Sequence, residues 1–260
     1  MEYLKLLGGK ALLFGIFLML IRIGAGWVKS HGKLEFQISW GLREVAEVFF
    51  IFLAFQAIAI YFKQPLDAGD NLEGVVAVWS AVEYLFLIVL IWCFVRQLLG
   101  SRMANLGWIP GRRTRDIFIT LQGFATIVVL AVLTNLLYWT EILERSSKII
   151  RSVSFHELIS GGLFSSVQIG LVLLISPVCE ETLYRGFIYP VLRNRLPAPL
   201  SAILISLFFA ALHFDPSNFM LLFLMSIAAT IAYEKSRWIG APIAVHAFYN
   251  ALVLKGFFAY

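Results

Sequence analysis

Long runs of apolar residues, separated by short polar segments, dominate the chain from beginning to end. A helix that crosses a bilayer needs about 20 mostly apolar residues. Eight segments approach this length and composition: residues 8–27, 45–62, 74–95, 117–139, 158–178, 197–213, 217–233 and 239–257. The last three are short and closely coupled, so their boundaries are weakly defined. The pattern predicts an all-α fold, a polytopic integral membrane helical bundle with about eight transmembrane helices.

The composition fits a chain that is mostly embedded in lipid. Hydrophobic residues make up 60% of the 260 residues and charged residues only 14%, and the mean hydropathy is +0.84. A soluble domain carries about 25% charged residues, so this chain has too little polar surface to cover a water-soluble globule. These numbers exclude a disordered chain, a disulfide-stapled secreted domain and a nucleic-acid-binding module. The net charge of +5 is explained by basic residues in short loops, which orient a protein in a bilayer.

We expect one integrated membrane domain whose two parts differ in character. Residues 1–150 contain apolar segments and no motif that we can match. Residues 151–260 carry polar side chains inside apolar segments, and we expect them to form the functional helical core. The expected partners are the lipid bilayer and a substrate, with no nucleic acid, and the oligomeric state stays open.

Ionisable residues inside apolar segments are expensive in lipid, at about 2.5–3.5 kcal/mol or more near the middle of a helix. Glu47 follows Arg43 by four residues near the end of a span, which is the spacing of a helical ion pair. Glu83 lies deeper and has no local partner. Two interpretations of Glu83 stay open: it packs in its protonated form, or it lines a cavity.

Two adjacent carboxylates, Glu180 and Glu181, lie near the end of a long apolar run. Arg185 follows Glu181 by four residues, which predicts an ion pair on one face of the helix. Glu180 then points about 100° away around the helix. With Glu181 neutralised by Arg185, Glu180 is left available as a general base whose pKa its surroundings can tune.

Three further polar residues recur in the last apolar segments: His213, then His246 and Asn250, which share one helical face because they are four residues apart. If the helix that carries Glu180 continues to about Arg193 and turns near residues 195–197, Glu180 and His213 lie at equal distances from that turn. Two antiparallel helices would then place both side chains at the same depth, about 24 Å from the turn. The same rise places His246 and Asn250 in the same layer of the membrane.

These residues resemble the CAAX-protease and bacteriocin-processing (CPBP) intramembrane protease family, which includes the prenyl-protein endopeptidases. The family pattern is Glu-Glu-x-x-x-Arg, then Phe-x-x-x-His, then His-x-x-x-Asn. All three motifs occur here in order, as Glu180-Glu181-Thr182-Leu183-Tyr184-Arg185, Phe209 to His213, and His246 to Asn250. Each motif alone is weak, whereas three in order on apolar helices are specific. The resemblance covers residues 158–256.

The resemblance implies hydrolysis of a peptide bond within the membrane, and the residue types fit that reaction. Glu180 and His213 would hold and deprotonate a water molecule for attack on the scissile carbonyl. His246 and Asn250 would donate hydrogen bonds to the developing oxyanion. Glu181 would orient the helix and tune Glu180, together with its partner Arg185.

The family is often called a metalloprotease, and the need for a cofactor is a separate question. Glu180, His213 and His246 could supply one carboxylate and two imidazoles to a catalytic zinc ion. The chain has no His-Glu-x-x-His, the usual helical zinc motif. We favour water activated by a glutamate with no required cofactor, and we keep zinc as the alternative.

Two other classes of function are compatible with the sequence. A proton-coupled transporter could use these acids and histidines as a relay, but such proteins often show two related halves, and no internal repeat is found here. A non-catalytic scaffold or immunity-type protein could bind a peptide without cleaving it. The substrate also stays open, as either a prenylated peptide or another membrane peptide.

Overall fold

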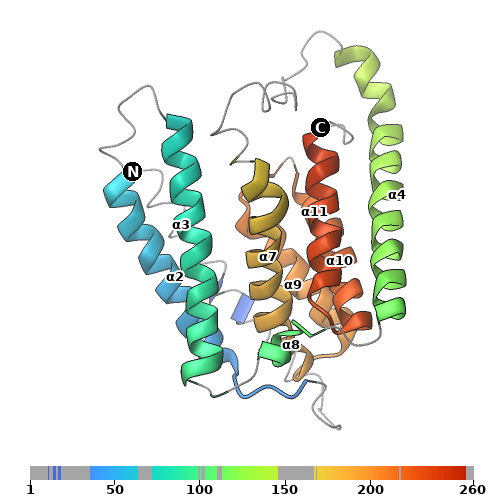
Figure 1. The fold of residues 1–260 in the computed structure, drawn as a ribbon. Helices are drawn as coiled ribbons and strands as arrows, with labels where there is room; N and C mark the ends of the chain where they lie inside the picture. The colour runs from blue at the N-terminus through green and yellow to red at the C-terminus, as the bar shows by residue number, and fades with distance from the viewer. Residues whose placement is uncertain are drawn as a thin grey trace.

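The computed structural model describes residues 11, 14–15, 17–18, 36–63, 72–98, 100, 103–109, 113–145, 167, 169–216 and 218–255. Every regular element within these residues is helical, and they contain no β-strand (Figure 1). The predicted all-α fold is therefore confirmed. Most of the predicted span at residues 8–27 and nearly half of the span at 158–178 lie outside the described residues, so the number of eight transmembrane helices stays a prediction.

The first half of the chain contributes α2 (Leu42–Lys63), α3 (Leu72–Trp92), η1 (Cys93–Leu98), η2 (Met103–Leu106) and α4 (Arg113–Arg145). The second half contributes η3 (Leu171–Ile175), α7 (Ser176–Glu181), η4 (Thr182–Ile188), α8 (Tyr189–Arg193), α9 (Ala198–Leu212), α10 (Phe219–Ser236) and α11 (Gly240–Leu254). Most of these helices begin and end within a few residues of the apolar segments that predicted them. There are two exceptions: α4 extends beyond its apolar segment at both ends, and the helix formed by η3, α7, η4 and α8 continues to Arg193, well past the apolar segment 158–178.

Three of the described helices contain segments long and apolar enough to cross a membrane: Val78–Arg96, Thr114–Asn135 and Phe219–Ser236. Large apolar side chains such as Leu85 on α3 and Val129 on α4 point outward and are more than half exposed. Exposed aliphatic side chains along a helix are unfavourable in water and favourable in lipid. The outer faces of α3 and α4 are therefore lipid-facing surfaces.

The helices of the second half form the centre of the bundle (Figure 1). The pairs α9–α10 and α10–α11 pack against each other, and α4 covers α10 and α11 on one side. On the other side, α2 packs on α3, and α3 contacts η3, α7 and η4. The segment that carries Glu180 and Glu181 thus lies between the first pair of helices and the last group.

The helix that carries the two glutamates runs without a break from η3 to the end of α8. It contains two wide π-helical segments, and each is followed at once by a segment with a proline near its start, Pro177 in α7 and Pro190 in α8. Proline has no N–H and its ring collides with the carbonyl four residues earlier, so a wider turn before it lets the helix continue. The expected extension to Arg193 is confirmed, and α9 starts at Ala198 after Pro197.

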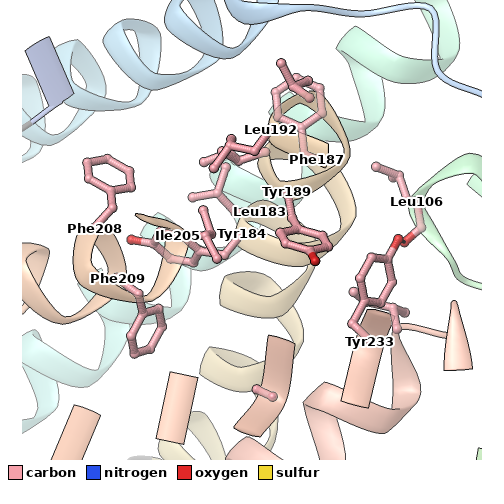
Figure 2. Close-up of a cluster of buried hydrophobic side chains, with 14 of the residues drawn as sticks. Leu106, Leu183, Tyr184, Phe187, Tyr189, Leu192, Ile205, Phe208, Phe209 and Tyr233 are labelled. Atoms are coloured by element: carbon pink, nitrogen blue, oxygen red, sulfur yellow. Dashed lines mark hydrogen bonds between the residues drawn. The ribbon is translucent and has the colours of Figure 1, made fainter. Parts of the chain in front are cut away.

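Aromatic side chains fill the space between this helix and its neighbours. Figure 2 shows Phe187 and Tyr189 from the central helix, Phe208 and Phe209 from α9 and Tyr233 from α10, all buried. Burial of one such side chain contributes about 1.5–3 kcal/mol. This packing determines how the central helix is rotated, and therefore which of its side chains face the neighbouring helices.

The segment before α2 is tied to the central helix by hydrogen bonds. The Trp40 indole Nε1–H donates to the Phe187 carbonyl at 2.8 Å. The Asn194 side chain pairs with the backbone of Phe36, accepting from its N–H and donating to its carbonyl, both at 2.9 Å. The Arg237 guanidinium also lies over the Phe36 ring, 3.9 Å from its centroid. The beginning of the first helical pair is thus anchored to the second half of the chain.

Gly107 follows η2 at a point where a side chain has no room. Its φ is +86°, and a Cβ atom there would lie 2.8 Å from the Tyr233 ring and 3.1 Å from the Arg237 carbonyl oxygen. Gly100 also has a positive φ, of +60°, but a Cβ atom there meets nothing within 4 Å. The two glycines therefore separate the cost of backbone strain from the cost of crowding.

We expect Gly107→Ala to lower the stability of the detergent-solubilised protein clearly more than Gly100→Ala does. Both variants bear a strained backbone at about 1–2 kcal/mol, and Gly107→Ala bears overpacking at about 1–3 kcal/mol in addition. Thermal unfolding followed by circular dichroism measures the difference. Equal losses in the two variants would contradict the close contact between Gly107 and α10.

Candidate functional site

The side chains of Glu180 and His213 face each other, with Glu180 in α7 and His213 at the C-terminal end of α9. The His213 Nε2 atom lies 3.9 Å from the Glu180 Oε2 atom, and the two side chains remain 32% and 17% exposed. The predicted equal depth of these residues is therefore confirmed. The separation is too long for a direct hydrogen bond and is compatible with one bridging water molecule or substrate atom.

The two carboxylate oxygens of Glu180 have different surroundings. Its Oε1 atom accepts a short hydrogen bond from the Ser176 hydroxyl, one helical turn earlier. The Tyr84 phenol interacts with the same serine, so α3 supports this arrangement. The Glu180 Oε2 atom is inaccessible to solvent and has no hydrogen-bond partner within the described residues. A carboxylate oxygen without a partner beside an imidazole is an acceptor ready for a substrate proton.

His213 ends α9, and its ring is fixed by the backbone. Its Nδ1 atom lies 2.8 Å from the Phe209 carbonyl oxygen. Because a carbonyl can only accept, Nδ1 carries the proton, and the Nε2 atom of the neutral ring is an acceptor directed toward Glu180. The Phe209 ring packs under His213 with 4.5 Å between centroids. Glu180 and His213 therefore present two basic atoms to one space.

A cavity of about 210 Å³ lies beside this pair. Glu180, Leu183, Tyr184, Leu212 and His213 form its wall on the second half of the chain. The opposite wall consists of side chains from α2 and α3, which are mostly apolar. Glu180 and His213 thus face α2 and α3, two helices to which the sequence analysis assigned no function.

Glu181 points to the other side of the helix, into a closed polar network. Its Oε1 atom accepts from Arg185 Nη1 at 2.9 Å and from His246 Nδ1 at 2.8 Å. Arg185 also donates from Nη2 to the hydroxyl and the carbonyl of Ser226, at 2.6 and 2.8 Å, and from Nε to the Thr230 hydroxyl at 3.3 Å. Glu181 and Arg185 are fully buried, and the predicted ion pair between them is confirmed. The network connects the central helix with α10 and α11.

His246 and Asn250 lie on one face of α11 but make separate contacts. His246 is buried against Glu181 and the Phe209 ring. The Asn250 amide donates to the Val172 carbonyl in the π-helical segment η3 at 2.9 Å. Neither residue lines the cavity that contains Glu180 and His213. The six candidate residues therefore form one partly buried pair that lines the cavity, one buried triad, and one asparagine whose amide donates to η3.

A comparison with known protein families finds a match in the second half of the chain. Residues 162–252 match the family model described as type II CAAX prenyl endopeptidase Rce1-like. This segment is therefore similar to that family, and we call it the Rce1-like segment. It contains every residue of the three motifs, so the resemblance based on those motifs is confirmed.

One curated relative matches the chain over a similar length. The UPF0177 protein in abiGi 5'region of Lactococcus lactis subsp. cremoris is 32% identical over 91 residues. The match covers 35% of this chain and 38% of that protein. No solved structure matches the chain. The Rce1-like segment and the apolar helices together identify a multi-pass membrane protein.

The sequence analysis missed some residues around the Rce1-like motifs, and for others it missed their position in the site. Ser176 precedes Glu180 by one turn on the same helix, which is a local signal that could have been noticed. Tyr84, Gln56 and Glu83 belong to α2 and α3, and only the three-dimensional packing brings them to the cavity. Glu83 lines that cavity, which decides between the two interpretations left open for it.

The Rce1-like segment does not assemble the alternative zinc site. Within the described residues, no three His, Cys, Asp or Glu side chains lie close enough together to hold a metal ion. Glu180 and His213 are neighbours, whereas His246 directs its Nδ1 atom to Glu181. The donor set of one carboxylate and two imidazoles therefore does not fit the observed arrangement, and we derive no step through a metal.

We expect Arg185→Met to destabilise the protein by about 3–5 kcal/mol, because it leaves the buried Glu181 carboxylate without its cation. Arg43→Met is the matched control, since Arg43 also pairs with a glutamate four residues away, Glu47, but on the surface of α2. That variant should unfold at the wild-type temperature. Thermal unfolding in detergent measures both variants. A wild-type unfolding temperature for Arg185→Met would contradict the structural role of the network.

Proposed function

We propose that the protein is an intramembrane endopeptidase in which Glu180 and His213 activate water for attack on a peptide bond. The observation that carries this proposal is the free Glu180 Oε2 atom facing the His213 Nε2 atom at the wall of a cavity. The Rce1-like match of residues 162–252 supports the reaction class. The alternative of a non-catalytic scaffold needs no such pair of bases.

In the proposed reaction, a water molecule bound between the two residues donates one hydrogen bond to each. Its oxygen attacks the scissile carbonyl carbon, and Glu180 takes the proton that the water loses. The tetrahedral intermediate then expels the amine, which takes that proton from Glu180, and the C–N bond breaks. The neutral His213 accepts from the water through Nε2 and so orients it. General-base assistance of this kind contributes about 100- to 10,000-fold to the rate.

The two neighbouring glutamates have different duties in this mechanism. Glu180 can exchange its proton because it lines the cavity opposite His213 and forms no ion pair with a lysine or arginine of the described residues. Glu181 is neutralised by Arg185 and fixes His246, so it supports the helix rather than touching the substrate. Because His246 Nδ1 donates to the Glu181 carboxylate, His246 would donate to an oxyanion through Nε2 only as an imidazolium.

We expect Glu180→Gln to lower the rate of peptide cleavage by about 1,000-fold or more with little change in stability. The amide keeps the size of the side chain but cannot take a proton. The assay uses purified protein in lipid nanodiscs, a library of membrane-associated peptides and mass spectrometry of the products, with a chelator present in one arm. Rates unaffected by the chelator agree with activation of water by protein side chains alone.

Glu181→Gln is the matched comparison, since it changes the adjacent residue in the same way. It should lower the unfolding temperature through the loss of the Arg185 pair, a loss that Glu180→Gln does not share. Wild-type cleavage by Glu180→Gln would overturn the proposed mechanism.

A further inference from the structure

The cavity beside Glu180 and His213 has a second polar group on its opposite wall. Gln56 of α2 and Glu83 of α3 both line it, and the Gln56 amide donates to Glu83 Oε2 at 3.4 Å. The rest of that wall is mainly apolar, with side chains such as Phe52 and Leu87. A polar pair within an otherwise apolar wall is typical of a position that orients a ligand.

Glu83 has no counter-charge within the protein as described. It lies in the apolar segment Val78–Arg96, and no Lys, Arg or His of the described residues approaches it within ion-pair distance. Glu47 and Glu181 differ in this respect, since Glu47 pairs with Arg43 and Glu181 with Arg185. An acid at this depth without a basic partner points to a role in binding.

The lining of the cavity is acidic as a whole. Among the described residues, it includes the carboxyl groups of Glu83 and Glu180, a single histidine, and neither lysine nor arginine. Tyr84, which follows Glu83 on α3, lines the same cavity. A cationic group complements such a cavity, while an anionic one is repelled.

We propose that Glu83, positioned by Gln56, forms a specificity subsite that binds the side chain of a lysine or arginine next to the scissile bond of a peptide substrate. This inference rests on the proposed function, because the same cavity must hold the scissile bond against Glu180. The Glu83 carboxylate would accept hydrogen bonds from the cationic head group. Apolar neighbours such as Phe52 and Leu87 would pack against the methylene groups of the substrate side chain.

The test uses the full chain in lipid nanodiscs and fluorogenic peptides that differ at one position near the cleaved bond. That position is in turn lysine, norleucine or glutamate, and the amino terminus is either free or acetylated. We expect the wild type to cleave the best lysine peptide about tenfold faster in kcat/KM than its norleucine counterpart. Glu83→Gln should remove this preference and leave cleavage of the norleucine peptide within about twofold of wild type. Glu83→Lys should shift the preference to the glutamate peptide.

Glu47→Gln is the matched control, because it removes a glutamate from the neighbouring helix α2 that does not line the cavity. It should keep the lysine preference. The inference is overturned, with the proposed function intact, if peptides are cleaved without a lysine preference or if Glu83→Gln retains that preference. A preference that disappears on acetylation would assign the cation to the amino terminus and overturn the side-chain subsite.

Failure of the proposed function gives a different result. If the wild type cleaves none of the peptides, the endopeptidase proposal is contradicted, and fluorescence anisotropy of the same peptides then tests the subsite by itself. Tighter binding of the lysine peptide that is lost in Glu83→Gln would support the subsite. Equal binding of the lysine and norleucine peptides would overturn it.

Discussion

The buried ion pair between Arg185 and Glu181 holds the central helix in the position on which the rest of the site depends. A guanidinium in a membrane bundle is costly to bury unless each of its donors has a partner. Arg185 meets this condition with Glu181, Ser226 and Thr230, which brings α10 against the central helix, and Glu181 extends the network to His246 of α11. With one glutamate fixed on this face, the adjacent one is directed to the other face.

The contrast between the two glutamates is a consequence of helical geometry. Neighbouring residues of a helix point about 100° apart, so one sequence position separates a closed network from an open cavity. Each glutamate has one oxygen without a hydrogen-bond partner among the described residues, but the other oxygen differs: that of Glu181 accepts from Arg185 and His246, whereas that of Glu180 accepts from Ser176. In the proposed mechanism, Glu181 therefore contributes to stability and Glu180 to the reaction.

Much of this arrangement could be predicted from the sequence, because it follows from regular helices. Equal numbers of residues on the two sides of a turn place Glu180 and His213 at one depth, and a spacing of four pairs Glu181 with Arg185. The contact of Asn250 with Val172 could not be predicted, because it uses a carbonyl of a π-helical segment that no simple period reveals. The sequence singled out Glu83 but not its position near Glu180, and it gave no sign of Tyr84, since nothing local shows which distant helix packs beside α7.

This packing shows how the apolar first half of the chain contributes to the cavity. The helices α2 and α3 form the wall that faces Glu180 and His213, so the cavity exists only where both halves of the chain meet. Chemistry would then belong to the Rce1-like segment, and selection of the substrate to α2 and α3.

The central claim is that Glu180 and His213 act as one unit, and a double-mutant cycle in peptide cleavage tests it most directly. The cycle compares kcat/KM of Glu180→Gln, His213→Ala and the double variant with that of the wild type. If both residues hold one water molecule, the double variant loses about as much activity as the more damaging single variant. Losses that multiply would show that the two residues act independently, and would contradict the account.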